Sequence, residues 1–478
     1  MLMIIDGKEV PSSNGQTIEV INPATGKVVD TVPAATEADV NLAVEKAKIG
    51  QKKWAKVPVY QKVEILYKFL DLVEAAKDDL AKTLSDETGK PITEARAEIG
   101  NIPIAFKAFS ERAKHLYGET IPAGLEAGQD KNLLITQREP LGVVACIIPF
   151  NFPCDLFDQK VAPALLAGNA AIVKPSTDNP LTLIKLTGLL VKAGVTDGAI
   201  GVITGRGAAV GGPLAAHPDV HGVTFTGSTE VGLETGKNAI GHLAHVALEL
   251  GGNDAFIVLD DADIELAAEE LIWGRMYNTG QVCCASKRFL VHNKVADKFT
   301  QKAIENIKRL KQGPPSEEST QVGCLISEKA AIEVERQINK VVAQGGKVVL
   351  GGKRNGAFIE PTVITGVPKT ADVAIDDEIF GPVVPIIGFD TVAEAIEIAN
   401  SSKFGLCGCV FTSNIKTAFA VCSALECGGT VINGASFFRS FEMPFGGYKY
   451  SGLGTEGVLS TFDEITRLKT IVLKNIVS

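Results

Sequence analysis

The chain has 478 residues, of which 45% are hydrophobic and 22% charged, and its formal net charge is −9. Its 48 glycines are spread without a short repeat. This composition excludes collagen-like and disordered chains and is typical of a globular α/β enzyme. The acidic balance leaves no basic surface for nucleic acid, so no nucleic-acid partner is expected. Because the length exceeds one ordinary core, we expect two large lobes.

The ends and the cysteines of the chain predict a cytoplasmic protein with no membrane partner. Asp6 follows only a few apolar residues, so the N-terminus lacks the apolar core of a signal peptide, and no stretch approaches a membrane span. Nine cysteines form an odd set, which favours reduced thiols. Four of them could suggest a metal site, but they lack the paired spacing of zinc ligands, so none is expected: Cys407, Cys409, Cys422 and Cys427.

The first part of the chain predicts short strands followed by helices. Residues 4–34 contain Asp-Gly, Asn-Gly and Asn-Pro dipeptides, which favour chain reversals between strands. Apolar residues at three- and four-residue spacing then predict an outer layer of helices over 37–54, 60–88 and 92–115. Residues 118–140 predict a hairpin. The tail at 464–475 alternates like a strand, and we expect it to pair with that hairpin or with a neighbouring subunit.

From residue 141 onward, continuous apolar strands alternate with helices. The first set comprises strands at 142–148, 170–174, 200–204 and 222–226, with helices at 156–167, 180–193, 207–216 and 228–239. The second set comprises strands at 254–259, 287–292, 347–350, 383–388, 406–412 and 429–433, with helices at 262–278, 294–310, 327–344, 392–400 and 415–424. This order predicts two α/β lobes with parallel sheets covered on both faces. Ligands are expected at the carboxyl ends of the strands.

The stretch from Asn278 to Arg288 carries our candidate nucleophile, Cys283. A thiol at the end of a glycine-containing turn can lie where a helix begins, and a helix N-terminus favours the thiolate. We therefore expect Cys283 to lie at such a position.

Several loops after strands of the first set could bind a dinucleotide. The segments 205–211, which includes Gly207 and Gly211, and 227–232 both open helices, where free N–H groups can hold a pyrophosphate. Neither matches the G-x-G-x-x-G fingerprint, and a glycine after a strand is often only a tight turn. Lys174-Pro-Ser-Thr177 ends another strand and could bind a ribose or its phosphate, the alternative being a solvated lysine.

Two polar residues stand in apolar surroundings. Asn151 lies between Pro149 and Pro153, so its amide could be a rigid donor to an oxyanion, the alternative being an Asx-type cap. Glu249 lies in an apolar segment, where burial would raise its pKa toward the range of a general base. Its alternative role is that of a partnered structural acid.

Taken together, these motifs closely resemble those of the NAD(P)-dependent aldehyde dehydrogenase superfamily over nearly the whole chain. The matching patterns are Pro-Phe-Asn-Phe-Pro at 149–153, Lys-Pro-Ser at 174–176, Phe-Thr-Gly-Ser at 225–228, Glu-Leu-Gly-Gly at 249–252, Gly-Gln-Val-Cys at 280–283, Glu-Ile-Phe-Gly-Pro at 378–382 and Pro-Phe-Gly-Gly at 444–447. The resemblance implies a coenzyme-binding domain at 1–117 and 141–251, a catalytic domain at 252–455, and a β oligomerisation element at 118–140 and 456–478. It also implies a homodimer or homotetramer.

The resemblance implies a role for each catalytic residue. Cys283, not Cys284, would attack the aldehyde, and the Asn151 side chain and the Cys283 N–H would hold the oxyanion. After oxidation by NAD or NADP, Glu249 would activate water to hydrolyse the thioester to a carboxylic acid. Two alternatives remain: an enzyme that passes the thioester to CoA, a group that commonly lacks the acid supplied here by Glu249, and a catalytically silent protein on the same fold.

The resemblance also implies the coenzyme-binding residues, with Glu378 at the nicotinamide ribose: Ile148, Pro149, Phe150, Lys174, Ser176, Thr177, Gly207, Gly211, Phe225, Gly227, Ser228, Leu250, Glu378 and Phe380. Many NAD-preferring members have Glu where this chain has Thr177. A carboxylate there would repel a 2′-phosphate, so Thr177 is compatible with NADP and leaves the coenzyme preference open.

The substrate is expected to be a short, polar or anionic aldehyde. The segment 433–442 resembles the family loop that closes over the aldehyde, and it places Arg439 and Phe437 as substrate residues. The alternative for Arg439 is a salt bridge with Glu442. Succinate-semialdehyde enzymes usually have arginines where this chain has Gln159 and Tyr277, which disfavours that substrate. Lactaldehyde and glyceraldehyde-like, sulfonated or phosphonated short aldehydes remain candidates.

Overall fold

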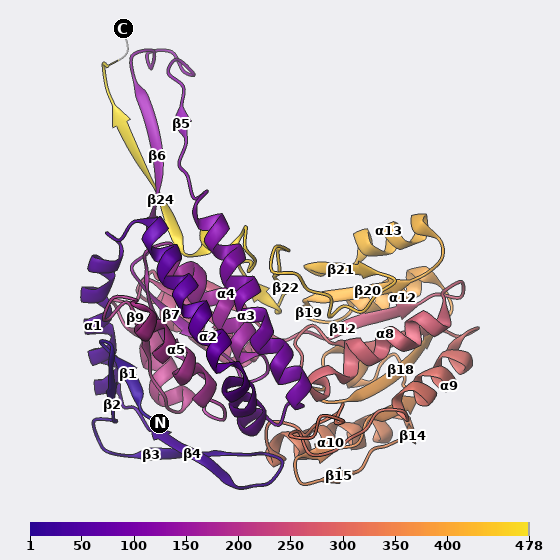
Figure 1. Ribbon diagram of the computed structural model, residues 1–478. Coiled ribbons are helices and arrows are strands. Elements are labelled where there is room, and N and C mark those ends of the chain that lie inside the picture. The colour runs from indigo at the N-terminus through magenta and orange to yellow at the C-terminus, as the bar shows by residue number, and fades with distance from the viewer. Residues whose placement is uncertain (477–478) are drawn as a thin grey trace.

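The computed structural model, described for residues 1–476, has two α/β lobes and a long β arm that projects from the first lobe (Figure 1). The predicted α/β class with two lobes is confirmed. Residues 477 and 478 of the predicted oligomerisation element lie outside the described residues.

The first lobe is built on an eight-stranded sheet whose central strands are parallel. In sheet order its strands are β2 (Lys8–Val10), β1 (Met3–Ile5), β9 (Ile200–Val202), β8 (Ala170–Lys174), β7 (Val143–Ile147), β10 (Gly222–Thr226), β11 (His245–Glu249) and β23 (Gly452–Leu453). Strands β7, β8 and β10 are buried along their whole length, as their continuous apolar sequence predicts. Their carboxyl ends therefore meet at one edge.

Helices cover both faces of this sheet. They are α1 (Glu37–Trp54), α2 (Val59–Thr88), α3 (Ile92–Ala113), α4 (Pro153–Leu166), α5 (Leu181–Ala193), α6 (Gly212–Ala216), α7 (Thr229–Ile240) and α14 (Thr461–Glu464). The predicted outer layer is confirmed: Phe69 of α2 packs on Phe106 of α3, with ring centroids 4.9 Å apart. Helix α2 ends at Thr88, as its predicted range does, and the next residue, Gly89, takes a left-handed φ of 77°. This layer holds α3 against α4 beside the cleft.

The second lobe has a seven-stranded sheet. In sheet order its strands are β14 (Lys347–Leu350), β17 (Thr362–Thr365), β18 (Val383–Phe389), β13 (Ser286–His292), β12 (Asp254–Val258), β20 (Cys407–Phe411) and β21 (Gly429–Ile432). The covering helices are α8 (Ile264–Met276), α9 (Ala296–Ile307), α10 (Glu328–Ala343), α11 (Asp372–Ile375), α12 (Val392–Asn400) and α13 (Ile415–Ala424). Short peripheral pairs complete the chain: β3 (Thr17–Ile21) with β4 (Val28–Pro33), β15 (Arg354–Asn355) with β16 (Phe358–Ile359), and β19 (Phe404–Gly405) with β22 (Tyr448–Lys449).

Several elements differ from the predictions, and strand β17 of the second sheet was not predicted. The helix predicted at 207–216 begins as a π-helical turn, Gly207–Gly211. The helix predicted at 262–278 ends at Met276, and a short 3-10 turn, Tyr277–Gly280, follows it. Strand β11 was not predicted, although it carries Glu249 at its carboxyl end and pairs in parallel with β10.

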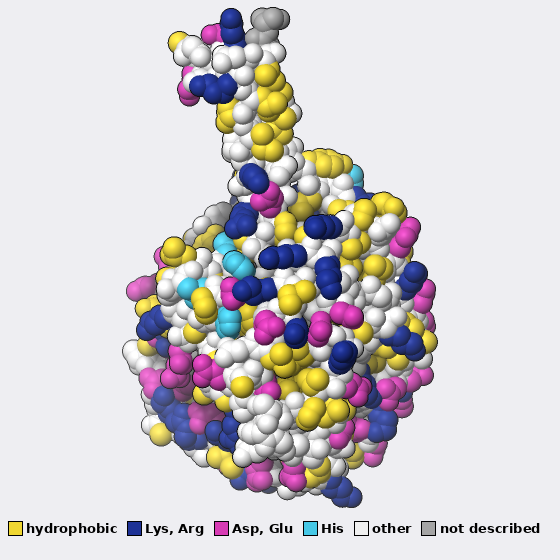
Figure 2. All heavy atoms as spheres, turned by 90° about the vertical axis from the view of Figure 1, so that its left-hand side faces the viewer, with side chains coloured by type: hydrophobic (Ala, Val, Ile, Leu, Met, Phe, Trp, Pro, Cys, Tyr) yellow, Lys and Arg dark blue, Asp and Glu magenta, His cyan; other side chains and the backbone are white. Residues whose placement is uncertain are grey.

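The arm consists of β5 (Thr120–Ile121), β6 (Leu133–Pro140) and β24 (Thr466–Leu473). Strand β24 pairs antiparallel with β6 from Thr466 opposite Pro140 to Leu473 opposite Leu133, so the predicted pairing of the tail with the hairpin is confirmed within one chain. Hydrophobic side chains lie along the arm (Figure 2), and Leu468 on β24 is 60% exposed. Within residues 1–476, no helix is long and apolar enough to cross a membrane.

A single buried guanidinium joins several elements of the second lobe. Arg288 of β13 is 3% exposed, and its side chain donates to the carbonyls of Asn253, Ala374, Ile398 and Ala399 at 2.6 to 3.2 Å. These carbonyls include the ends of α11 and α12, which need donors outside their own helices. Arg288 therefore ties both helices to the sheet.

We predict that Arg288→Met lowers the free energy of unfolding by about 3 kcal/mol or more, because several buried carbonyls lose their donor. Chemical denaturation measures this change. The control is Arg336→Met on α10, which removes an exposed pair with Glu333 and should change the stability by less than about 0.5 kcal/mol. Equal midpoints for the two variants would contradict this role of Arg288.

Candidate active site

A cavity of about 340 Å³ brings residues of both lobes together. Helices α3 and α4 and the turn after β7 contribute Ala97, Asn101, Asn151, Phe152, Asp155, Leu156 and Gln159. The second lobe and the segment after β21 contribute Trp273, Tyr277, Val282, Cys283, Cys284, Phe437, Arg439 and Phe441. The cavity thus unites the predicted nucleophile, the predicted oxyanion donor and both predicted substrate residues.

Cys283 lies between the 3-10 turn Tyr277–Gly280 and strand β13. The expected helix N-terminus is therefore wrong: the chain after the thiol enters a strand. A hydrogen bond from the Cys284 thiol nevertheless lowers the pKa of Cys283 to about 7. The charges of Lys287 and Arg439 also lower this pKa, whereas burial raises it. The pKa of Cys284 is raised well above its usual range, so Cys283 is the thiol that ionises near neutral pH.

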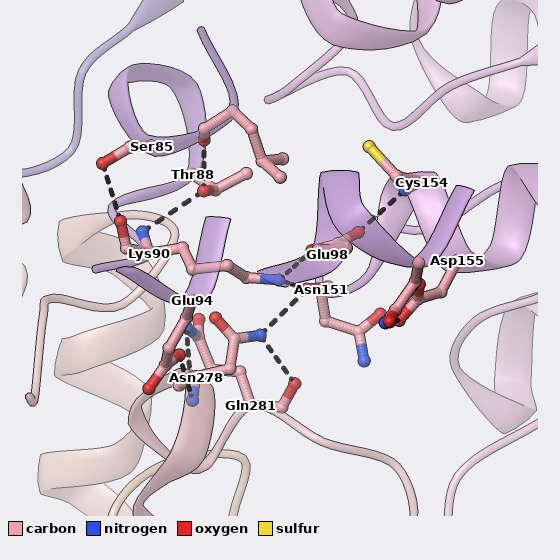
Figure 3. A network of polar contacts seen from close by, with 12 residues as sticks. Ser85, Thr88, Lys90, Glu94, Glu98, Asn151, Cys154, Asp155, Asn278 and Gln281 are labelled. Carbon is pink, nitrogen blue, oxygen red and sulfur yellow. Dashed lines mark hydrogen bonds and ion pairs between the residues drawn. The ribbon is translucent and has the colours of Figure 1, made fainter. Parts of the chain in front are cut away.

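Asn151 lies in the turn between β7 and α4. Its carbonyl accepts hydrogen bonds from Lys90 Nζ at 2.8 Å and from Asn278 Nδ2 at 2.9 Å, while its side chain extends away from these contacts (Figure 3). The N-cap of α4 is Phe152, and the Asn151 amide has no hydrogen bond with any residue of 1–476, so the alternative of an Asx-type cap is wrong. The amide is left free at the cavity.

Glu249 ends β11 and is 5% exposed. Burial, followed by the neighbouring carboxylate of Glu456, raises its pKa well above the usual range. Its Oε2 has no partner among the described residues, so the alternative of a partnered structural acid is not observed. A carboxyl group with a raised pKa is a better base for a proton of water.

Arg439 forms an ion pair at 3.2 Å, but its partner is Glu456 and not the predicted Glu442. Glu456 is shared with the buried Lys160, whose Nζ lies 2.6 Å away. The guanidinium also stacks over Phe445, 3.6 Å from the ring centroid. Arg439 is therefore held by the protein while it lines the cavity.

The predicted ribose site lies at the carboxyl end of β8. Lys174 is the last residue of that strand and is 5% exposed, so the alternative of a solvated lysine is wrong. Burial lowers its pKa to about 8, and its ammonium has no hydrogen bond or ion pair within residues 1–476. Thr177 donates to the Gly205 carbonyl at 3.1 Å, and Ser176 accepts from the N–H of Asp178 at 3.3 Å. A buried ammonium without a partner fits the hydroxyls or phosphate of a nucleotide.

The loop after β10 permits a close approach of the backbone. A Cβ at Gly227 would lie 2.6 Å from the Phe225 ring, so this position requires glycine. Ser228 caps α7 by accepting from the N–H of Val231 at 3.4 Å, and the helix N-terminus behind it favours an anion. By contrast, a Cβ at Gly207 or Gly211 would meet no atom within 4 Å, so neither is required for packing.

The predicted nicotinamide side of the site lies near Cys283. Glu378 accepts from the N–H of Gly252 at 3.3 Å and pairs with Lys287 at 3.1 Å, and Lys287 also donates to the Cys283 carbonyl. Phe380 packs edge-on against Phe150 of the first lobe, with ring centroids 5.9 Å apart. The other predicted residues here are Ile148 and Leu250, which are buried, and Pro149, which follows β7.

Sequence reasoning missed several charged residues of the site. Lys160, Lys287 and Glu456 are buried and pair across elements far apart in the chain. Lys160 and Lys287 each pair with a carboxylate far away in the chain, so neither carries a local sequence signal. Asp155, whose pKa burial raises to about 7, and the Gln159 amide, which has no partner within the described residues, also line the cavity.

Comparisons with known proteins agree with this geometry. Residues 10–471 match the aldehyde dehydrogenase family. The chain belongs to the aldehyde dehydrogenase family. This match confirms the prediction that the chain is an NAD(P)-dependent aldehyde dehydrogenase.

Similar members of the family match this chain over nearly its whole length. A lactaldehyde dehydrogenase of Methanococcus vannielii is 36% identical over 99% of this chain and 100% of its own. A glutarate-semialdehyde dehydrogenase of Pseudomonas putida is 38% identical over 98% of this chain and 97% of its own. The crystal structure of an E. coli NADP-dependent enzyme has a TM-score of 0.96 and 35% identity, with 99% of this chain and 98% of that chain covered.

We predict that alkylation of the aldehyde dehydrogenase by iodoacetamide follows one ionisation near pH 7 and becomes faster as the pH rises through it, because the Cys283 thiolate is the reacting species. Cys284→Ala removes the hydrogen bond to Cys283 and should move this midpoint to a higher pH. Cys284→Ser keeps a donor and is the matched control. Stopped-assay inactivation rates measure the midpoint, and identical profiles for the Ala and Ser variants would contradict the role of that hydrogen bond.

Proposed function

We propose that the protein oxidises a short, polar or anionic aldehyde to the carboxylic acid with NAD⁺ or NADP⁺, through a covalent intermediate on Cys283. The observation that supports this most strongly is that one cavity contains a thiol with a pKa of about 7 and the free amide of Asn151. Aldehyde oxidation by a thiol requires a nucleophile and a donor to the oxyanion at the same carbon.

The residues act in sequence in this proposal. The Cys283 thiolate adds to the aldehyde carbon and gives a thiohemiacetal, whose oxyanion accepts from the Asn151 amide and from the Cys283 N–H. That N–H has no acceptor within residues 1–476. NAD⁺ or NADP⁺ supplies the hydride acceptor, and a thioester remains on Cys283. Glu249 takes a proton from water, the water oxygen adds to the thioester carbon, and the carbon–sulfur bond breaks to release the acid and the thiolate.

The coenzyme would be held by residues at the carboxyl ends of β8 and β10. The Lys174 ammonium and the Thr177 hydroxyl would face the adenosine ribose, and Gly227 and Ser228 would lie against the pyrophosphate. Glu378 would accept from the nicotinamide ribose. Because Thr177 carries no charge, Lys174 is free to pair with a 2′-phosphate, which supports use of NADP as well as NAD.

The lining of the cavity supports a substrate with a polar tail. The Gln159 amide, which has no partner within residues 1–476, the Asp155 carboxyl group, which accepts from Asn101 at 3.1 Å, and Arg439 offer donors and acceptors for it. Phe437 and other aromatic residues also line the cavity. Lactaldehyde and semialdehydes, which appear in the names of the two relatives, are therefore the first candidates.

The wider organisation follows the same family pattern. The proposed coenzyme-binding domain comprises 1–117 and 141–251, the catalytic domain 252–455, and the oligomerisation element 118–140 and 456–478. Strand β23 joins the first sheet from within the catalytic range. The exposed apolar residues of the arm support a homodimer or homotetramer, and nine cysteines free of disulfides support a cytoplasmic location.

We predict that Glu249→Gln keeps a first-turnover burst of NADH or NADPH and slows steady-state turnover by about 10²-fold or more, because the thioester forms but its hydrolysis lacks the base. Stopped-flow absorbance at 340 nm separates the two phases. Steady-state turnover at the wild-type rate would contradict the role of Glu249.

The substrate and coenzyme are tested together. The aldehyde panel comprises lactaldehyde, glyceraldehyde, succinate and glutarate semialdehydes, sulfonated and phosphonated short aldehydes, and butanal. Each aldehyde is assayed with NAD⁺ and with NADP⁺, and the product is identified by mass spectrometry. We expect free acid as product, the highest kcat/KM with a polar tail, and turnover with both coenzymes. A preference for butanal would contradict the proposed substrate class, and no coenzyme reduction with any aldehyde would contradict the proposed function.

A further inference from the structure

One asparagine side chain lies between the two halves of the catalytic site. Asn278 Nδ2 donates to the Asn151 carbonyl at 2.9 Å and also lies 3.3 Å from the Gln281 carbonyl, two residues before Cys283 (Figure 3). Gln281 donates back to the Asn278 carbonyl at 3.1 Å. A single amide therefore links the residue that carries the oxyanion donor to the loop that carries the nucleophile.

The backbone at this position is strained. Asn278 and Thr279 have φ values of 49° and 55°, in the left-handed region that is unfavourable for residues other than glycine. Strain of this kind persists where surrounding contacts hold it, and it costs about 1 to 3 kcal/mol per residue. Here Glu94 of α3 accepts from the Asn278 N–H at 2.8 Å, and Thr279 Oγ1 accepts from the Gly323 N–H at 3.1 Å.

The other side of the link is equally fixed. Lys90 donates to the same Asn151 carbonyl at 2.8 Å and forms an ion pair with Glu98, and both side chains are almost completely buried (Figure 3). Glu98 also accepts from the N–H of Cys154 at 2.8 Å, in the first turn of α4. With two donors on its carbonyl, Asn151 cannot rotate its peptide without losing two buried hydrogen bonds.

We propose that Asn278 is a positioning residue: it sets the separation between the Asn151 amide and the Cys283 thiol, and Glu94 holds it in the conformation that does so. The proposal rests on the proposed function, because it assumes that Asn151 stabilises the oxyanion. The catalytic loop and the oxyanion turn belong to different lobes, and a shift of about 1 Å between reacting groups can lower a rate about 10²-fold. Asn278 does not line the cavity, so it acts through the position of Asn151 relative to Cys283.

The direct test is Asn278→Gly, because glycine adopts the left-handed conformation without strain and removes only the side-chain amide. With the best aldehyde of the panel, we expect kcat to fall about 10- to 100-fold and KM to change little. In an Asn151→Ala background, Asn278→Gly should lower kcat by less than about twofold, because the donor that it positions is already absent. A role in stability alone would give the same factor in both backgrounds.

Glu94 provides a second, independent pair of variants. Glu94→Gln keeps an oxygen that accepts from the Asn278 N–H and should retain kcat within about threefold, while Glu94→Leu removes the acceptor and should match Asn278→Gly. Thermal unfolding and size-exclusion chromatography establish that each variant is folded. If Asn278→Gly does not fold, the Glu94 pair in the two backgrounds decides.

The outcomes separate the two proposals. Suppose that Asn151→Ala lowers kcat, but that Asn278→Gly or Glu94→Leu lowers kcat by the same factor in the wild-type and in the Asn151→Ala background. The positioning role is then overturned, and the proposed function stands. Wild-type kcat for Asn278→Gly also overturns the positioning role. If Asn151→Ala itself leaves kcat unchanged, the oxyanion role of Asn151 falls, and the positioning role falls with it.

Discussion

The carbonyl oxygen of Asn151 accepts one hydrogen bond from each lobe, and the geometry of the catalytic site depends on these two contacts. Lys90 approaches from the helical layer of the first lobe, and Asn278 approaches from the loop that leads to Cys283. Neither lobe holds a complete site, since Asn151 and Glu249 lie in the first and Cys283 in the second. The buried hydrogen bonds between the lobes therefore hold the two sheets in the relative position that forms the cavity. Their polar groups are costly to bury unless paired, so these hydrogen bonds also specify a single arrangement of the lobes.

The surroundings of Cys283 and Glu249 shift the pKa values of these two proposed reacting groups in opposite directions. A thiol donor, with Lys287 and Arg439 nearby, favours the thiolate of Cys283. Burial and Glu456 raise the pKa of Glu249, which makes its carboxylate form a stronger base. Two ionisable groups whose environments separate their pKa values in this way can take the roles of nucleophile and base at one pH. Arg439 lines the cavity, but its positive charge is already paired with Glu456.

Local sequence patterns predicted most of the fold, because apolar periodicity reports burial along one element. They failed where the conformation depends on distant contacts. Helix α8 stops at Met276 because Asn278 and Thr279 are held in left-handed conformations, and Glu94, which holds Asn278, lies 184 residues away in sequence. Glu94 and Glu98 are one turn apart on α3, a spacing typical of a solvated face, yet Glu98 is buried and Glu94 is half-buried. The position of Cys283 before a strand, rather than a helix, was missed for the same reason. Motifs predicted the proposed reacting groups, whereas the residues that orient them and shift their pKa values have no local signature.

The most direct test of this account is to locate the covalent intermediate. The enzyme is mixed with aldehyde and coenzyme, quenched in acid within the first turnover and digested with trypsin, and the peptide from Met276 to Lys287 is sequenced by tandem mass spectrometry. We expect this peptide to carry the acyl group of the substrate on Cys283, with Cys284 unmodified. An acyl group on Cys284, or coenzyme reduction without any acylated cysteine, would contradict the account.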